Sequence, residues 1–528
     1  MFHGEKRLRG HVKVRRSIVV SRFLRHCFCD SAQVIRKSSV ATAYSSSLMK
    51  ITAPLFVCIA VLGLSLSSSG QENAAAERVF KAGAATSNIT PPLGMTIVGN
   101  FAPQPVANHV HDELHARCLV LDDGTTKLAF VVADIISLGR DVWDEAKQKV
   151  AAATGIPVAN MMFSGTHTHS SVSALTNDDP SLNYRQFIIS RVVDGVQRAV
   201  TNLEPARIAW GTGKLPQHQF NRRWLLKDGL TEINPFGGQD RAVMNPSGLI
   251  RSRLLKPAGP TNPEVYCLSV KALDGRQLAL MANYWLHYVG GVPRDHLSAD
   301  YFGEFCRQVE KLTSQAQQQP PCVGLLANGP CGDVNNNDYS GKSPAVKREP
   351  YEKIKLVAND LAQEVLRVEK SLKYQDWVPL KAATSDLELA VRRPTPEMVQ
   401  RAEEILARPK EATPMHRHEA AYAERTLAAR DVQPNTISVV MQAFRIGELG
   451  IASIPFEVFT EIGLEIKAKS PFKDTFTIEL ANGSNGYLPT PAQHELGGYE
   501  TWLGTNRVER EASVKITAQI LEMLKAVR

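Results

Sequence analysis

The sequence predicts an α/β fold in which a large mixed sheet carries flanking helices and an inserted helical hairpin. Three observations predict it. Between Phe80 and Val527, apolar runs of strand length alternate with amphipathic stretches of helical period. The same region contains no internal repeat and no long low-complexity linker. At 528 residues, the chain has enough length for one very large domain or for about two to three ordinary ones.

The first part of this region alternates strands and helices. The stretch TKLAFVVADII is a continuous apolar run, which predicts a buried strand. The following helix ends before Gly155 and Pro157, because both residues interrupt a helical pattern. We therefore expect a strand at 126–136, a helix at 141–154, a strand at 158–165, a helix at 183–200 and a strand at 206–211.

The second part continues the alternation and adds the hairpin. Residues 394–431 are charged and rich in helix formers, and Pro409 and Pro414 interrupt them, which predicts two exposed helices inserted between strands. One helix is expected after Arg507, at the end of the chain. The other expected elements are strands at 265–272, 278–287 and 322–329, and helices at 301–312 and 351–371.

Basic charge is concentrated at the start of the chain. The formal net charge is +8, but residues 1–50 hold eleven Lys and Arg against Glu5 and Asp30, a local balance of +9. The remaining residues therefore carry about −1. This balance gives no electrostatic reason for a nucleic-acid partner.

The leader has the pattern of a secretory signal. From Met49, Lys50 precedes an apolar run, Pro54 to Leu66, that is too short to span a membrane comfortably and is followed by small residues. We expect residues 49–70 to be a signal peptide and residues 1–48 to be a basic leader that is not translated, with Met49 as the real start. The protein would then be secreted or periplasmic, or membrane-anchored if the signal stays uncleaved.

The cysteines argue against a disulfide framework. The body of the chain contains five, Cys118, Cys267, Cys306, Cys322 and Cys331, and an odd number leaves at least one unpaired. No C-x-x-C pair occurs there, so a cysteine-rich zinc site is not expected.

Two histidines follow the expected strand at 158–165. In SGTHTHSS, His167 and His169 are separated by one threonine. In extended backbone, residues two apart point to the same side, so both imidazoles could reach one ion. The alternative is that they are hydrogen-bonded loop residues.

Other candidate ligands lie far away in the sequence. His109, His111 and His115 precede an apolar strand in HVHDELHARCLVL, and Glu457 follows a buried strand and Pro455. Catalytic zinc needs about three protein ligands from His, Asp or Glu and an open position. Glu457 could equally be a surface residue at the start of the next helix.

These segments together resemble the neutral, non-lysosomal ceramidases. SNITPPLG, HDELHAR, SGTHTHSS, NYWLHYVGG, LSADYFG, NGPCGDVNNN, PFEVFTEIG and NGSNGYLPTPAQHELGGYE are each similar to a segment of that catalytic domain, over about residues 80–528. SGTHTHS and the Asn-Gly-Tyr segment are the most specific of them.

The resemblance implies one catalytic zinc and hydrolysis of a linear amide, with a small-molecule or lipid substrate and a role in sphingolipid metabolism. The implied ligands are His111, His167 or His169, Glu457 and Tyr487. The remaining histidine of the pair would bind the substrate carbonyl or transfer protons. Tyr487 would be a ligand or a donor to the oxyanion. Membrane contact is possible but not evident in the body of the chain.

Two departures from the family pattern bear on the substrate. Asn335 stands in GDVNNN where the family has its catalytic serine, and asparagine can donate a hydrogen bond to an oxyanion but cannot act as a nucleophile. The C-terminal β-sandwich of ceramidases is also not found in this chain. We therefore expect the substrate to be shifted from ceramide, toward a more soluble amide.

Two other functions remain open at this stage. Gly165, His167 and His169 also fit the Gly-x-His-x-His pattern of two-metal phosphoesterases, although the additional segments that such enzymes need are not found. Asn335 also allows a noncatalytic binding protein that retains the fold.

Overall fold

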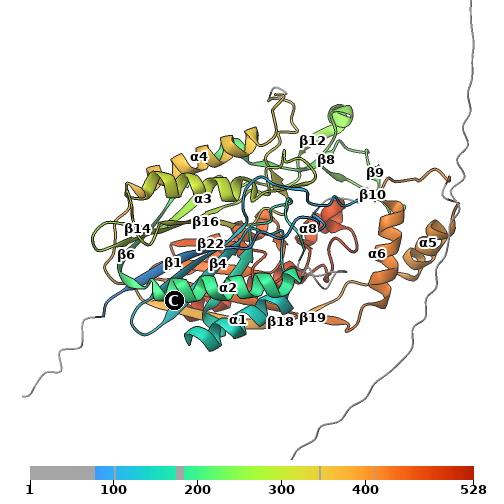
Figure 1. Ribbon diagram of the computed structural model, residues 1–528. Coiled ribbons are helices and arrows are strands. Elements are labelled where there is room, and N and C mark those ends of the chain that lie inside the picture. Colours follow the sequence, from blue (N-terminus) through green and yellow to red (C-terminus); the bar gives the residue numbers. More distant parts are fainter. Residues whose placement is uncertain (1–77, 100–102, 174–182, 344–345, 410) are drawn as a thin grey trace, which may run out of the picture. The chain divides into compact units, whose positions relative to one another are not determined.

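Figure 1 shows the computed structural model, which describes residues 78–99, 103–173, 183–343, 346–409 and 411–528. The expected basic leader (1–48) and signal peptide (49–70) lie outside these residues. Within the described ranges, the helices are too short or too polar to cross a membrane.

A mixed eight-stranded sheet forms the centre of the molecule, which confirms the predicted fold class. Its strands are mainly antiparallel, and the parallel pairs lie at its two edges. In spatial order they are β16 (Val323–Asn328), β14 (Gln277–Tyr284), β13 (Glu264–Ala272), β6 (Glu204–Lys214), β1 (Lys81–Asn88), β3 (His115–Asp122), β4 (Lys127–Ala133) and β5 (Met161–Gly165).

A second sheet packs face to face against the first. Its four strands are, in order, β18 (Leu380–Ala390), β19 (Thr436–Ile446), β20 (Leu449–Ile454) and β22 (Asp474–Glu479). Aromatic side chains join the two sheets, with ring centroids 5.3 Å apart for Phe130 and Phe444. The alternation of apolar residues along both sheets thus buries one continuous core between them.

Helices cover the outer face of each sheet, so the molecule has four layers (Figure 1). Burial of the apolar stripe of each amphipathic helix closes the outer cores. The helices on the eight-stranded sheet are α1 (Arg140–Thr154), α2 (Tyr184–Thr201), α3 (Asp300–Thr313) and α4 (Glu352–Glu369). Those on the four-stranded sheet are α7 (Thr460–Lys469) and α9 (Ala512–Val527).

A helical hairpin projects between β18 and β19. It consists of α5 (Pro396–Ala407) and α6 (Glu419–Asp431), which pack on each other through a small cluster that includes Ala402, Ile405 and Ala423. The Thr395 side chain caps α5 by accepting a hydrogen bond from the Met398 amide. In Figure 1 the pair stands at the edge of the two-sheet body.

Short elements complete the fold around the ends of the long strands. Two short pairs matter for the site: β21 (Glu457–Val458) with β23 (Tyr487–Leu488), and β17 (Val334–Asn335) with β7 (Phe220–Asn221). The others are β2 (His109–Val110), β8 (Arg223–Leu226), β9 (Glu232–Ile233), β10 (Gln239–Asp240), β11 (Ala242–Met244), β12 (Leu254–Pro257), β15 (His296–Leu297) and α8 (Pro491–Leu496).

The parallel strand pairs locate the site. β4 pairs with β5, β14 with β16, and β20 with β22, each in parallel. In open α/β sheets, ligands bind beyond the carboxyl ends of such strands. His167 follows β5, His287 follows β14 and Glu457 follows β20, so three distant segments leave the sheets at corresponding ends.

A lysine is buried in this architecture and has no carboxylate partner among the described residues. The Nζ of Lys147 in α1 donates to Oδ1 of Asn482 at 2.6 Å, and burial lowers the pKa of Lys147 to about 7. An unfolded lysine holds its proton up to about pH 10.4. Between these two pH values the unfolded state binds more protons, so stability should rise with pH.

Replacing Lys147 with methionine should therefore stabilise the protein most at neutral pH. We expect the difference in free energy of unfolding between Lys147→Met and the parent to be largest near pH 7 and to shrink toward pH 10, as measured by urea titrations across that range. Lys149→Met is the matched control, because Lys149 lies on the same helix but is exposed and paired with Glu145. A difference that does not change with pH would show that Lys147 is charged in the folded protein.

Candidate active site

Three imidazoles converge beyond the ends of β5 and β14. Nε2 of His167 lies 3.1 Å from Nε2 of His169 and 3.1 Å from Nε2 of His287. Within the described part of the chain, these three residues form the group of His, Cys, Asp and Glu side chains whose geometry suits a metal ion. The structure therefore brings His167 and His169 together, as the sequence predicts, and adds His287.

His167 adopts a backbone conformation that the sequence does not predict. Its φ of 70° is left-handed, whereas the expectation that both rings could reach one ion assumed extended backbone at the two histidines. The strand ends at Gly165, and the His167 amide then donates to the Ile135 carbonyl at 3.0 Å. A residue other than glycine is strained in the left-handed region of backbone conformation. Such strain is concentrated at functional sites.

Backbone carbonyls orient two of the rings. Nδ1 of His167 lies 2.9 Å from the Ile136 carbonyl oxygen, and Nδ1 of His287 lies 3.3 Å from that of Cys331. Since a carbonyl can only accept, each Nδ1 carries a proton and each neutral ring has its lone pair on Nε2. This is the arrangement by which proteins orient histidines that bind metals.

Glu457 and Tyr487 complete the cluster. They occupy paired positions of β21 and β23, and their side chains are hydrogen-bonded. Oε2 of Glu457 lies 3.3 Å from Nε2 of His167 and 3.9 Å from Nε2 of His287. This buried oxygen accepts no well-formed hydrogen bond from any described residue. A buried carboxylate oxygen without a hydrogen-bond donor is costly unless a cation compensates its charge.

The electrostatics of the cluster favour a cation at its centre. Burial disfavours the charged form of His167, but the Glu457 carboxylate outweighs burial and raises the pKa of His167. Burial, with the nearby His167, holds the pKa values of His169 and His287 well below their ordinary range, so both are neutral. His169 and His287 therefore already have the protonation state that a metal ion requires, whereas the raised pKa of His167 means that this ring would release its proton when an ion binds.

The spacing of the donors fits tetrahedral zinc. Zinc bonds nitrogen and oxygen ligands at about 2.0–2.1 Å, which places tetrahedral ligand atoms about 3.3 Å apart. The three distances among His167, His287 and Glu457 are 3.1, 3.3 and 3.9 Å. Of the three residues, His167 is the one that lies close to both of the others. The ring of His169 stacks on the ring of Tyr288, with the two centroids 3.8 Å apart.

His111 lies away from this cluster, contrary to its predicted role as a ligand. Its ring stacks on Tyr351 at 3.5 Å, and its charged neighbours are Asp112, Arg307 and Lys355. The reason is local: β2 pairs with β15, which places His111 beside the loop before α3 rather than beyond β5. In the candidate ligand set, His287 takes the place that the sequence analysis gave to His111.

Asn335 is near the centre but has no free donor. Its Nδ2 donates to Oδ1 of Asn245 and to the Tyr339 hydroxyl, both at 2.9 Å, while its Oδ1 accepts from the Asn337 amide. An amide has two N–H groups, so both are occupied. The predicted hydrogen bond from Asn335 to an oxyanion would require this network to open.

A buried carboxyl group holds two site segments in place. Glu479, at the end of β22, accepts hydrogen bonds from the amides of Val458 at 2.7 Å and Cys331 at 3.2 Å, and from the Cys331 thiol at 3.0 Å. Burial raises the pKa of Glu479 to about 8. Its contacts join the segment that carries Glu457 to the segment that supports His287.

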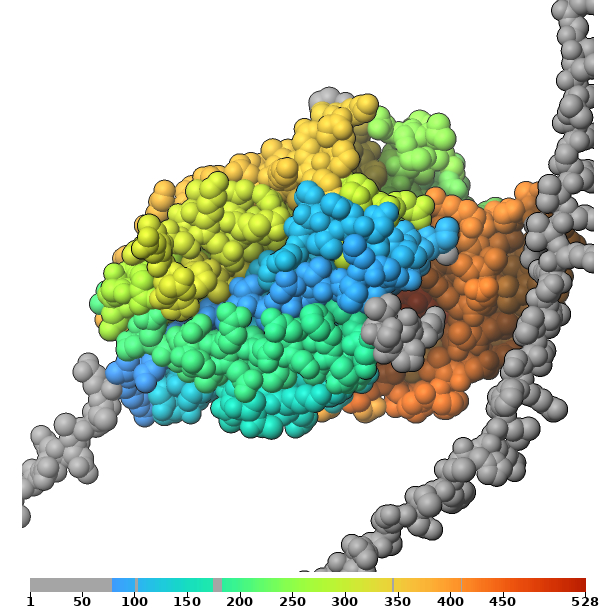
Figure 2. Space-filling view, viewed as in Figure 1, coloured from blue at the N-terminus to red at the C-terminus, as the bar shows by residue number. Residues whose placement is uncertain are grey.

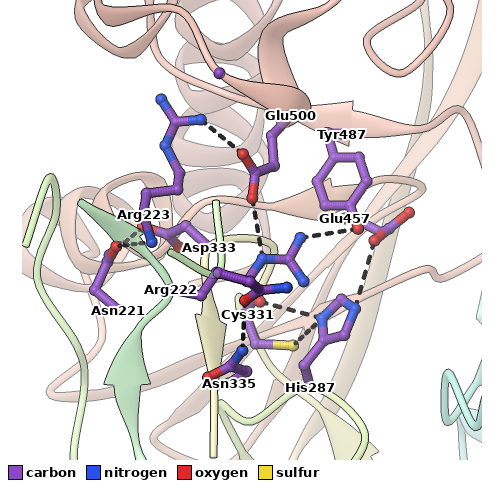
Figure 3. Close-up of polar contacts among 12 residues, drawn as sticks. Asn221, Arg222, Arg223, His287, Cys331, Asp333, Asn335, Glu457, Tyr487 and Glu500 are labelled. Atoms are coloured by element: carbon purple, nitrogen blue, oxygen red, sulfur yellow. Dashed lines mark hydrogen bonds and ion pairs between the residues drawn. The ribbon is translucent and has the colours of Figure 1, made fainter. Parts of the chain in front are cut away.

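Arg222 connects this centre to a second buried acid. Figure 3 shows its guanidinium between Glu500 and the pair formed by Glu457 and Tyr487. Its Nε donates to Glu500 at 3.0 Å and its terminal nitrogen to the Tyr487 hydroxyl at 2.9 Å, while Arg223 binds the other oxygen of Glu500 at 2.7 Å. Arg222 could not be identified from the sequence, because a lone arginine in a loop carries no spacing signal.

A cavity of about 530 Å³ gives access to Glu457 and Tyr487. Its wall combines Tyr499 and the segment after it with α6 of the helical hairpin. Figure 2 shows a hollow beside the orange hairpin, with dark red atoms of the C-terminal segment at its floor. The volume lies in the usual range for small-molecule sites.

The fold and this cluster define a candidate metal-binding hydrolase of the α/β class. The chain belongs to the neutral/alkaline non-lysosomal ceramidase family, since the sequence model of the N-terminal domain of that family matches residues 80–343, half of the chain. The predicted family is thereby confirmed, and the protein is a ceramidase-like hydrolase.

Solved ceramidase structures share its fold. Neutral ceramidase from Pseudomonas aeruginosa superposes with a TM-score of 0.64 at 15% identity, over 85% of this chain and 75% of that chain. A ceramidase complexed with C2 gives a TM-score of 0.63 at 16% identity, over 86% of this chain and 76% of that chain.

Proposed function

We propose that this protein is a secreted, zinc-dependent hydrolase that cleaves an N-acyl amide bond. The observation that carries the proposal is the cluster of three histidine Nε2 atoms beside Glu457, whose buried Oε2 lies 3.3 Å from His167 and 3.9 Å from His287 and whose side chain lines a cavity. Membership of the ceramidase family supports the amide as the bond cleaved. The apolar run after Met49 supports secretion.

In this proposal His167, His287, Glu457 and Tyr487 hold the ion. Zinc at that position would supply Lewis-acid polarisation of an amide carbonyl and lower the pKa of water. The Tyr487 hydroxyl donates to Glu457 and accepts from Arg222, so the phenol is held in one orientation. Burial raises the pKa of Tyr487 well above its ordinary value, so this hydroxyl keeps its proton at neutral pH.

His169 is the candidate for proton transfer. It is neutral, lies 3.1 Å from His167 and stacks on Tyr288, which holds its ring beside the ligand set. A neutral imidazole within reach of the scissile bond can bind the carbonyl oxygen or pass a proton to the leaving amine. The donor role that the sequence analysis gave to Asn335 is less well supported, because its amide is occupied.

The test is hydrolysis of N-acyl amides by the purified chain, with and without metal. We expect turnover that a chelator abolishes and that one equivalent of zinc restores. A panel of N-acyl amides of different amines and chain lengths, ceramide included, would be scored by release of the free fatty acid.

The same panel separates the alternatives. Phosphodiester turnover with two metals per chain would support a metallophosphoesterase instead. Absence of turnover from both the parent and Asn335→Ser, with zinc bound, would support a noncatalytic binding protein.

A further inference from the structure

The cavity above the candidate metal centre is lined by three arginines. Arg392, Arg425 and Arg507 are its basic lining residues, and Glu457 is the acidic residue among them. If Glu457 binds a metal ion, the positive charge of that ion compensates the negative charge of the carboxylate. The cavity then has excess positive charge, whereas a pocket for a neutral lipid amide needs none.

These arginines have no carboxylate partner among the residues that the structure describes. The Arg425 guanidinium lies over the Tyr422 ring, 4.8 Å from its centroid. Arg392 donates to two neutral acceptors, the Thr501 carbonyl at 2.5 Å and Oδ1 of Asn506 at 3.2 Å. Arg507 makes a backbone contact, in which its carbonyl accepts from the Arg392 amide. Arg430, which lies on the same helix as Arg425, pairs by contrast with Glu403 and Asp431.

Crowding of like charges adds to this imbalance. Arg507 is exposed at the cavity mouth, yet desolvation lowers its pKa, the charge of Arg425 lowers it further, and the nearby Glu457 opposes both effects. Burial, followed by repulsion from Arg510, lowers the pKa of Arg392 to about 10. An anion bound among them would relieve both effects.

Arg507 lies beside the segment that holds Glu457. Arg507 packs along Gly486, where a β-carbon would meet its Cγ at 3.8 Å, and the Gly486 carbonyl accepts from the Glu457 amide at 3.0 Å. Arg425 packs against Gly504 across the same cavity. An anion held by Arg507 would therefore be close to the metal ligands, within a few bonds of the amide that is cleaved.

The rest of the wall is apolar. Much of it comes from α6 and from the strands that flank the hairpin, and it would accept a hydrocarbon chain. The apolar side chains are those of Val391, Ala428, Ala429, Val432, Ile437 and Leu503.

We propose that the substrate is an N-acyl amino acid, with its carboxylate bound by Arg507 and Arg425 and its acyl chain on the apolar wall. This inference rests on the proposed amidase function. Water adds across the amide, the C–N bond breaks, and the products are a fatty acid and a free amino acid whose nitrogen takes up the proton. Arginine binds carboxylates through paired charge-assisted hydrogen bonds, which gives both affinity and orientation.

The experiment compares two amides that differ in charge. N-dodecanoylglycine and N-dodecanoylethanolamine are supplied separately to the zinc-loaded parent and to Arg507→Gln, Arg425→Gln and Arg430→Gln. We expect the parent to prefer the anionic amide by about 10–100-fold in kcat/KM. Arg507→Gln should remove most of this preference, because it should lower kcat/KM for the anionic amide far more than for the neutral one. Arg430→Gln should match the parent. Arg430 lies on the same helix as Arg425, but it pairs with Glu403 and Asp431.

Two outcomes would overturn the inference, and a binding measurement separates it from the proposed function. Equal kcat/KM for both amides, or a preference that survives Arg507→Gln, would leave an amidase without an anion site. If neither amide is hydrolysed, calorimetric titration of the metal-free chain with N-dodecanoylglycine still decides. Binding that is lost in Arg507→Gln and kept in Arg430→Gln would support the anion site alone, and absence of binding would overturn it.

Discussion

Replacing His287 with alanine is expected to remove the metal ion and to lower amide hydrolysis by roughly 10³-fold or more. His287 supplies an Nε2 atom 3.1 Å from that of His167 and 3.9 Å from the Glu457 carboxylate, so its loss leaves the ligand set incomplete. Metal content per chain would be measured after exhaustive dialysis, together with kcat/KM. The parent should retain about one zinc ion and His287→Ala much less.

His111→Ala is the matched control for this prediction. His111 was the histidine favoured from sequence, yet it stacks on Tyr351 outside the cluster, so we expect this variant to keep both metal and activity. Thermal unfolding gives a second readout, because a ligand that binds the folded state raises the midpoint. Zinc should raise it for the parent and for His111→Ala, but little for His287→Ala. The opposite pattern would restore the ligand set expected from sequence.

The contrast between His111 and His287 shows what sequence patterns can locate. His109, His111 and His115 form a dense local cluster, but β2 directs that segment toward β15 and the loop before α3. His287 is a single histidine at the end of an apolar strand, a pattern that is usual for a core residue. The proposed ligands His167 and His287 are 120 positions apart, so no spacing rule links them.

One sequence signal could have identified His287. His167, His287 and Glu457 each follow a buried apolar run that forms a strand with a parallel neighbour. Polar residues just beyond the carboxyl ends of such strands are expected to meet. The fold itself was predictable because the strands and helices of the body follow apolar periodicity. The left-handed turn at His167 was not, because it depends on contacts with Ile135 and Ile136.

The position of Arg222 leads to the second large effect. Its terminal nitrogen donates to the Tyr487 hydroxyl at 2.9 Å, and Tyr487 in turn bonds to Glu457. The cation is fully buried and is balanced by Glu500, which also binds Arg223. Arg222 thus fixes the phenol and supplies positive charge beside a point where negative charge would develop during hydrolysis.

We expect Arg222→Met to lower kcat by about 10²–10³-fold, the usual effect of removing one such donor. Glu500 keeps its bond to Arg223, so the charge left behind remains partly compensated. Metal content should stay near that of the parent, because Arg222 donates to only one of the four proposed ligands, Tyr487, and the other three remain in place. This retention distinguishes the variant from His287→Ala, in which activity and metal are lost together.

A double-mutant cycle tests whether Arg222 acts through Tyr487. If it does, adding Arg222→Met to Tyr487→Phe should cost little beyond Tyr487→Phe alone, because the hydroxyl that Arg222 positions is already gone. Arg222→Lys should recover part of the activity, since it restores the charge but not the two-point contact with Tyr487 and Glu500. Independent, multiplicative losses in the double variant would mean that Arg222 supports the fold or the substrate by another route, and that the tyrosine is held by its pairing with Glu457 alone.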